Sequence, residues 1–274
     1  MIFLQRETII QMGDKMYKLF SQQISHDGIT FKHTRGASDR SGKEFHIYHE
    51  IILFLGGDAE FISEHIHMKP THSTLIVIPK ETYHQMIIHN TPERYHRCVL
   101  QFHDIPQLSR LISESMSALT IIEADSNIRY LFDKLIGYTA SQHSQPPLLS
   151  AVLTLLLSEI TARDPLILTE NPQNPLVRRA VDYINQHIGR RLTVDEIAAC
   201  CSVSPSTLSH IFKREMNIPL HRFIIKKRLI NAYHRISAGE PATTAAMECG
   251  FNDYSGFYKQ YKKTFGFPPS QRTR

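Results

Sequence analysis

The chain has 274 residues, of which 42% are hydrophobic and 21% are charged. This balance is typical of a globular protein with room for two domains. The longest apolar run, Leu148–Leu157, is much shorter than the roughly 18 residues that a membrane-spanning helix needs. Charged residues interrupt the N-terminal segment MIFLQRETIIQMGDK, which also has no small-residue cleavage site. We therefore expect neither a membrane helix nor a signal peptide.

The charges are distributed unevenly along the chain, although the formal net charge is only +5. Residues 172–274 contain 16 Lys and Arg against 7 Asp and Glu, a net charge of +9, whereas residues 1–171 carry a net charge of −4. A basic C-terminal third suits a domain that binds phosphates, because each neutralised phosphate releases counterions. Charge alone is explained equally well by a basic solvated surface. The four cysteines are too few for a disulfide framework at this length, so we expect reduced thiols in a cytoplasmic protein.

The N-terminal part is predicted to be rich in β-strands. Short apolar runs between turn residues predict strands over residues 29–103, namely EIILFL, AEFI, LIVIP, QMIIHN and RCVLQF. No helix-length pattern intervenes, which favours an antiparallel barrel or sandwich. Residues 105–163 change to helical spacing, and Leu148–Thr161 is the most apolar of the expected helices.

A segment rich in proline and asparagine separates two predicted domains. It contains TENPQNP and spans residues 164–175, a composition typical of a spacer. We therefore predict one domain over residues 1–163 and a second over residues 176–274.

The second predicted domain contains an internal repeat. Residues 193–219 and 242–268 align with an offset of 48 positions before a turn and 49 after it, so that Cys201 falls on Cys249 and Phe212 on Tyr261. Each copy is expected to fold as helix, turn, helix. The expected capping residues are Thr193, Ser204 and Asp253 at helix starts, and Asn217 and Gly266 at helix ends.

A helix is expected to join the two copies. Apolar residues recur at helical spacing from Leu220 to Ile236 and mark about five turns, roughly 28 Å. That length is near the roughly 34 Å of one turn of B-DNA. The two second helices would then face successive major-groove segments on one side of a duplex. The alternative at this point is an all-α interaction domain with a basic face.

Residues 176–271 resemble the DNA-binding domain of the AraC/XylS family of bacterial transcription regulators. The resemblance is carried by DEIAACCSVSPSTLSHIFKRE, by the helix IIKKRLINAYHRI and by ECGFNDYSGFYKQYKKTFGFPPSQRTR. It implies two helix-turn-helix units that bind double-stranded promoter DNA. Family members commonly activate transcription by contacting RNA polymerase, and no enzymatic activity or cofactor is implied.

The resemblance also assigns roles to residues of each second helix. Base-edge contacts fall on Ser206, Thr207, Ser209 and His210 in the first copy and on Tyr254, Ser255, Tyr258 and Lys259 in the second. Phosphate contacts, which set the register, fall on Lys213, Arg214, Lys262 and Lys263. His210 stands where the family often has arginine, and histidine cannot make the bidentate contact of arginine with guanine.

The first predicted domain is similar in layout to the cupin-like barrels that sense ligands and dimerise in such regulators. The segments EFHIYHEIILFLGG and LIVIPKETYH resemble the two halves of a cupin core. We expect a small-molecule effector, in this family often a sugar or other nutrient, at His46, Tyr48, His49, Glu50 and His84. The helices over residues 105–163 imply a homodimer, or alternatively pack on their own barrel.

Two other functions stay open. In the first, a metal-binding cupin enzyme is fused to the DNA-binding domain, with ligands at Glu44, His46, Glu50 and His84. In the second, the regulator has no ligand and is controlled only by its abundance. The sequence contains no catalytic triad, phosphate loop or Cys-x-x-Cys site, so we predict that the protein is not an enzyme.

Overall fold

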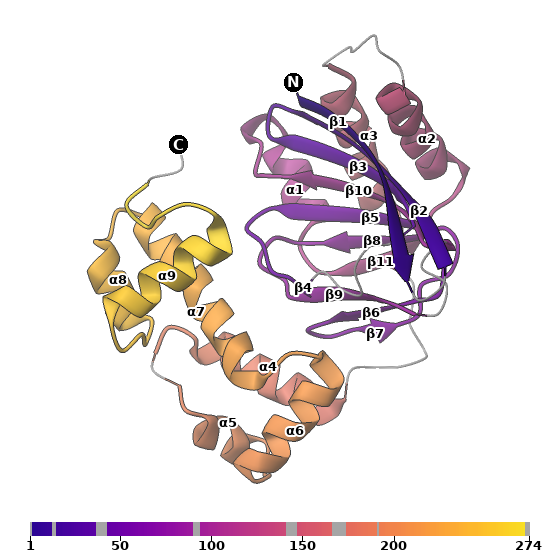
Figure 1. Ribbon diagram of the computed structural model, residues 1–274. Coiled ribbons are helices and arrows are strands. Elements are labelled where there is room, and N and C mark those ends of the chain that lie inside the picture. The colour runs from indigo at the N-terminus through magenta and orange to yellow at the C-terminus, as the bar shows by residue number, and fades with distance from the viewer. Residues whose placement is uncertain are drawn as a thin grey trace. The chain divides into compact units, whose positions relative to one another are not determined.

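The computed structural model describes residues 2–12, 15–36, 43–89, 94–140, 147–165, 174–190 and 192–271 (Figure 1). The chain divides into two compact units. The first holds nearly all of residues 1–170 and the second holds residues 171–274. The predicted linker over residues 164–175 lies mostly outside the described residues, and the domain bounds that it defines stay a prediction.

The first unit contains two antiparallel sheets. The larger one has seven strands in the order β1-β2-β3-β10-β5-β8-β11. Its strands are β1 (Ile2–Met12), β2 (Lys15–His26), β3 (Ile29–Arg35), β10 (His96–Phe102), β5 (His49–Gly56), β8 (Thr74–Ile78) and β11 (Thr120–Glu123). The smaller sheet has the order β4-β9-β6-β7, formed by β4 (Lys43–Glu44), β9 (His84–Ile88), β6 (Ala59–Ser63) and β7 (His67–Met68).

This architecture confirms the prediction that the first domain is rich in β-strands. The prediction that these strands close into a barrel is wrong. The described strands lie in two sheets that do not join into one closed, hydrogen-bonded barrel. All five apolar runs of the sequence form strands, namely β5, β6, β8, β9 and β10. Strands β1 and β2 were not predicted, because their apolar residues are interrupted by charged and polar ones that resemble a solvated terminus.

Three helices come after β10 in the chain and pack on the larger sheet (Figure 1). They are α1 (Ser109–Ser115), preceded by the 3-10 helix η2 (Pro106–Leu108), α2 (Ser126–Ala140) and α3 (Pro147–Thr161). Their buried residues, such as Phe132 and Leu153, share one core with Phe31 and Leu100 of the sheet. The apolar stripe that was expected to dimerise is therefore mostly covered by the unit's own sheet, although Leu155 of α3 remains 53% exposed.

Strand β5 is buried on both of its faces, because successive side chains of a strand point to opposite sides. Ile51 and Leu53 belong to the core that includes the helices. Glu50, on the opposite face, forms an ion pair with His84 of the smaller sheet. The face of β5 that carries Glu50 therefore looks toward the smaller sheet, and polar residues gather there.

The second unit is helical. Its helices are α4 (Pro175–His187), α5 (Val194–Cys200), α6 (Pro205–Met216), α7 (Leu220–Ser237), α8 (Ala242–Glu248) and α9 (Tyr254–Phe265). The helix pairs α5–α6 and α8–α9 correspond to the two sequence repeats, and α7 joins them. Helix α4 was not predicted, because its first residues Asn174 and Pro175 end a proline-rich segment. In the structure Asn174 caps this helix by accepting from the amide of Leu176.

The two turns have the same backbone hydrogen bonds, 48 positions apart. The amide of Ser202 donates to Ala199 over 3.0 Å, and that of Gly250 donates to Met247 over 3.0 Å. Both residues adopt positive φ, +58° for Ser202 and +83° for Gly250. The repeat in the sequence is thus a repeat in the backbone, including one left-handed residue in each turn.

The predicted capping residues are confirmed. Thr193 and Glu196 form a capping box at α5, whereas Ser204 and Asp253 cap α6 and α9 by accepting from backbone amides. Asn217 and Gly266 end α6 and α9 in the left-handed conformation. Each cap satisfies backbone groups that a helix end would otherwise leave without partners.

Candidate nucleic-acid interface and ligand site

Helices α6 and α9 place most of the predicted DNA-binding side chains on the surface of the second unit. Ser209 and Tyr254 are half-buried, and the others are exposed: Ser206, Thr207, His210, Lys213, Arg214, Ser255, Tyr258, Lys259, Lys262 and Lys263. Buried residues on the opposite side of each helix anchor it, including Leu208 and Phe212 in α6 and Phe257 and Tyr261 in α9. Each helix therefore presents a polar, mainly basic face and packs with an apolar one.

Some of these side chains already have partners within the unit. The Thr207 hydroxyl lies 2.8 Å from the hydroxyl of Ser204 in the cap of α6. Arg214 donates to the carboxylate of Glu215 over 2.6 Å. Tyr254 contacts the rings of Phe257 and Tyr258. The Ser206 hydroxyl also lies 3.0 Å from that of Ser204. Side chains with such contacts must leave or share them in order to reach DNA.

Arg228 of α7 links the two helix pairs. Its guanidinium donates to the carbonyl of Leu192, just before α5, and to the carbonyl of Gly250 in the turn of the second pair, each over 3.1 Å. Sequence reasoning did not single out Arg228, because a basic residue in a basic helix gives no sign of a buried structural role. The bridge fixes how the two pairs are oriented about α7.

A buried polar cluster lies between the two sheets of the first unit. It contains His46, from the loop before β5, Glu50 of β5 and His84 of β9. Both histidine Nε2 atoms lie close to the same carboxylate oxygen, Oε2 of Glu50, at 3.0 Å for His46 and 2.9 Å for His84. All three side chains are at most 7% exposed. We call this group the His46–Glu50–His84 cluster.

Neighbouring polar groups support the cluster. The Gln101 amide donates to Oε1 of Glu50 over 3.2 Å and to the Tyr48 hydroxyl over 3.3 Å. The Tyr48 ring stacks on His46, with centroids 3.8 Å apart. Burial alone would raise the pKa of Glu50, but the neighbouring rings of His46 and His84 hold that pKa well below its usual value. Glu50 is therefore a carboxylate.

The predicted ligand residues thus fall into two places. His46, Tyr48, Glu50 and His84 come together, as the sequence suggested. His49 does not join them, since its ring points to the other face of β5 and stacks on Phe102. This separation follows from strand alternation. The side chain of Glu44, the fourth metal-ligand candidate, lies outside the described residues; its backbone pairs with His84.

His49 instead belongs to a separate pocket of about 310 Å³ beside η2 and α1. Its Nε2 donates to Asp104 over 3.1 Å, and its Nδ1 accepts from the backbone amide of Lys80 over 3.2 Å. Burial lowers the pKa of His49, although the bond to Asp104 opposes this shift. Both ring nitrogens are occupied, so His49 is held as a neutral ring at the edge of a mainly apolar pocket.

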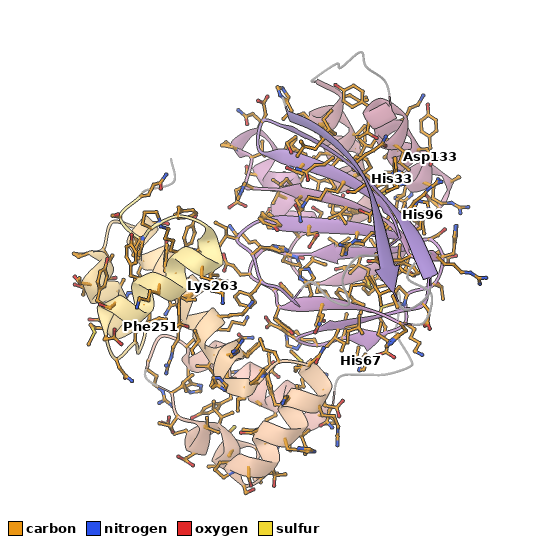
Figure 2. All side chains as sticks on the ribbon, viewed as in Figure 1. His33, His67, His96, Asp133, Phe251 and Lys263 are labelled. Carbon is orange, nitrogen blue, oxygen red and sulfur yellow. The ribbon has the colours of Figure 1, made fainter. Side chains whose placement is uncertain are left out.

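A second buried histidine lies on the helix side of the larger sheet. His33 of β3 and His96 of the neighbouring strand β10 approach each other with their Nε2 atoms 2.8 Å apart (Figure 2). Burial, together with the nearby His96 and Arg35, lowers the pKa of His33 to about 4.

No helix among the described residues has the length and the apolar character needed to cross a bilayer. The four cysteines are free thiols, and Cys200 is the exposed one.

Comparison with known proteins gives a family-model match within the second unit and matches to several curated transcription regulators. Residues 197–274 match a family model described as a helix-turn-helix domain. The chain is 26% identical over 139 residues to the "Probable transcriptional regulator LumQ" of Photobacterium leiognathi, covering 50% of this chain and 56% of that protein. It is 27% identical over 146 residues to the "Arabinose operon regulatory protein" of Salmonella typhimurium, covering 51% and 52%. The chain spans about half the length of these curated relatives.

Solved structures are similar as well. The C-terminal domain of AraT, a response regulator from Geobacillus stearothermophilus, is 28% identical over 37% of this chain and 90% of that one, with a TM-score of 0.34. ToxT from Vibrio cholerae is 12% identical and covers 92% of this chain and 95% of its own, with a TM-score of 0.39. The family model and these relatives support the resemblance of the second unit to the DNA-binding domains of AraC/XylS-type transcription regulators.

Proposed function

We propose that this protein is a transcription regulator that binds specific double-stranded DNA through two helix-turn-helix units, α5–α6 and α8–α9. The supporting observation is the duplicated helix pair, in which each second helix exposes a polar and basic face. The excess positive charge of residues 172–274 supports the same function, because phosphate binding is driven largely by charge.

The length of α7 supports simultaneous binding by both units. Its 18 residues correspond to about 27 Å at 1.5 Å per residue. Recognition helices of tandem sites are separated by about one turn of B-DNA, roughly 34 Å. The two helices α6 and α9, which flank α7, would enter successive segments of the major groove on one face of the duplex.

Different residues would read sequence and hold the backbone. We assign base-edge contacts to Ser206, Thr207, Ser209, His210, Tyr254, Ser255, Tyr258 and Lys259, and phosphate contacts to Lys213, Arg214, Lys262 and Lys263. Base contacts carry the sequence information, and phosphate contacts set position. The exposure of most of these side chains supports the assignment.

We infer that the first unit is a cupin-like sensing domain that responds to a small molecule, such as a sugar or another metabolite. The buried polar cluster and the separate pocket at His49 are its two candidate binding places. Exposed Leu155 and Tyr130 on the helices support the proposal of a homodimer. Contact with RNA polymerase and activation of transcription belong to the same proposal.

The DNA-binding function is tested by selecting duplexes from a randomised library with the full chain, and then measuring affinity at several salt concentrations. His210→Ala and Lys259→Ala should weaken binding to the selected site and relax its sequence preference. Lys262→Ala should weaken binding to all duplexes alike and reduce the salt slope by about one. Lys134→Ala, which removes an exposed lysine of α2 in the first unit, is the matched control. Unchanged affinity and salt slope in all three test variants would show that α6 and α9 are not the binding faces.

A further inference from the structure

We propose that the His46–Glu50–His84 cluster binds a divalent transition-metal ion between the two sheets of the first unit. One ligand atom from each of the three residues lies within 4.8 Å of the other two, and among the described residues this is the one group of this kind. The proposal concerns the first unit and does not depend on DNA binding by the second.

The orientation of the two rings carries the argument. Nδ1 of His46 lies 2.8 Å from the backbone carbonyl of Tyr48, and Nδ1 of His84 lies 3.1 Å from that of Thr82. A carbonyl oxygen only accepts, so both rings must donate through Nδ1. In a neutral ring Nε2 then carries a lone pair. Both Nε2 atoms face Oε2 of Glu50, at 3.0 and 2.9 Å.

Two neutral rings leave this arrangement unsatisfied. Their lone pairs would oppose those of a carboxylate at hydrogen-bond distance, with no proton in between. Two charged rings would supply the protons, but a single carboxylate would then face two buried imidazolium groups.

A divalent cation satisfies the three lone pairs directly. The net charge of the cluster equals that of the doubly protonated form, but each ligand atom now bonds the ion, and the remaining coordination positions take water or an anion. Histidine ligands of metals usually donate their second ring nitrogen to a carbonyl or carboxylate, as both rings do here.

The distances fit the same conclusion. Nitrogen and oxygen ligands lie about 2.0–2.2 Å from a divalent transition-metal ion, so two ligands are about 3 Å apart at the right angles of an octahedral ion and about 3.4 Å apart around tetrahedral Zn²⁺. The two Nε2-to-Oε2 distances, 3.0 and 2.9 Å, equal the first value and lie within about 0.5 Å of the second. Two histidines with one carboxylate are a ligand set for zinc and for non-haem iron, with positions left open to an outside ligand.

Gln101 orients the carboxylate for this role. It lies opposite Glu50 in the β10–β5 register and donates to Oε1 over 3.2 Å. Oε1 is therefore held by the protein, and Oε2 is directed at the two rings. Gln101 is a positioning residue of the proposed site.

The test uses the full chain, freed of any affinity tag, stripped with chelator and then titrated with Zn²⁺. Competition with a chromogenic chelator gives the affinity, and elemental analysis after gel filtration gives the stoichiometry. We expect one Zn²⁺ per chain and a raised melting temperature, because a ligand of the folded state stabilises it. Glu50→Gln and His84→Gln should weaken binding by more than about 100-fold, and Gln101→Met by about 10- to 100-fold.

His49→Gln is the matched control. His49 is a buried histidine of the same strand, 4% exposed, and lies outside the cluster. This variant should bind Zn²⁺ as tightly as the wild type. Circular dichroism checks that each variant is folded.

The proposal is overturned if the wild type binds no stoichiometric Zn²⁺, if folded His84→Gln retains wild-type affinity, or if His49→Gln loses as much affinity as His84→Gln. Where the ligand variants fail to fold, the visible spectrum of the Co²⁺-loaded wild type decides. Bands of protein-bound Co²⁺ support the site, and the spectrum of the hydrated ion excludes it. Because none of these measurements uses DNA, failure of the DNA-binding proposal would be seen separately.

Discussion

The guanidinium of Arg228 donates to the carbonyl oxygen of Gly250 over 3.1 Å, and that glycine occupies a left-handed turn position. A Cβ at position 250 would lie 3.0 Å from Cζ of Arg228. The turn of the second helix pair therefore leaves room for this side chain because the residue is glycine. Through the same arginine, which also binds Leu192, that turn is tied to the start of the first pair.

Replacing Arg228 should loosen the second unit as a whole. Arg228→Ala removes two charge-assisted hydrogen bonds and is expected to destabilise this unit by about 1.5–3 kcal/mol. Hydrogen-exchange protection should fall in both helix pairs. Affinity for a full DNA site should fall more than affinity for a half-site. Arg222→Ala, at an exposed position of the same helix, is the control and should leave protection unchanged. Loss of protection confined to one pair would contradict a bridging role.

The two turns offer a matched pair of substitutions. Gly250→Ala places a side chain at φ +83° against Arg228 and should destabilise the second pair by at least about 1 kcal/mol. Ser202→Gly relieves the equivalent strain at φ +58° in the first pair. The relief of strain should stabilise that pair. Glycine also gains conformational freedom in the unfolded chain, which opposes this effect, so the net stabilisation should be only about 0.5 kcal/mol.

Hydrogen exchange of peptides from α6 and α9 measures the two turn effects separately. Exchange should become faster in Gly250→Ala and slower in Ser202→Gly. If it changes in the same direction in both variants, the left-handed conformation does not strain the two turns alike.

The capping box of α5 should be measurable on its own. Thr193→Ala removes the side chain that accepts from the amide of Glu196 over 3.2 Å, and should cost about 1 kcal/mol of local stability. The equivalent N-cap of α8 is Pro241, which makes no side-chain hydrogen bond. Exchange should therefore accelerate in α5 and stay unchanged in α8. Unchanged exchange in α5 would mean that tertiary packing alone fixes the helix start.

The first unit should lose stability in mild acid because of His33. Its pKa is about 4 in the folded protein, against 6.5 for the ordinary side chain. Between these values the unfolded chain binds more protons than the folded one, so stability falls as the pH falls. The loss from pH 7 to pH 5 is on the order of 2 kcal/mol for this group.

Urea unfolding of the full chain at both pH values, followed by circular dichroism, measures the loss in the wild type and in His33→Gln. Glutamine does not titrate in this range, so the variant should show a smaller pH dependence. An equal dependence in both proteins would show that another group is responsible. His96, whose pKa is also lowered, chiefly by burial and then by Arg35, is the next residue to replace.

The sequence predicted the second unit well because its signals are local. Capping residues, such as Ser204 and Asp253, act within one helical turn, and the repeat aligns them. The first unit depends on contacts between distant strands. Glu50 and Gln101 meet through the register of β5 and β10, which no short pattern reports. The resemblance to a cupin core grouped His46 with His49, but the His46 ring contacts Glu50 on one side of β5 and the His49 ring stacks on Phe102 on the other.

Strand β5 has no face that tolerates a change of register. A single inserted residue within it would turn Glu50 toward the helix-packed core and an aliphatic neighbour toward His46 and His84. An insertion of two residues would restore the alternation beyond the insertion point. Related proteins that differ in the length of this strand should therefore differ by an even number of residues. Deletion of one residue from β5 would disrupt the polar cluster and the apolar core at once.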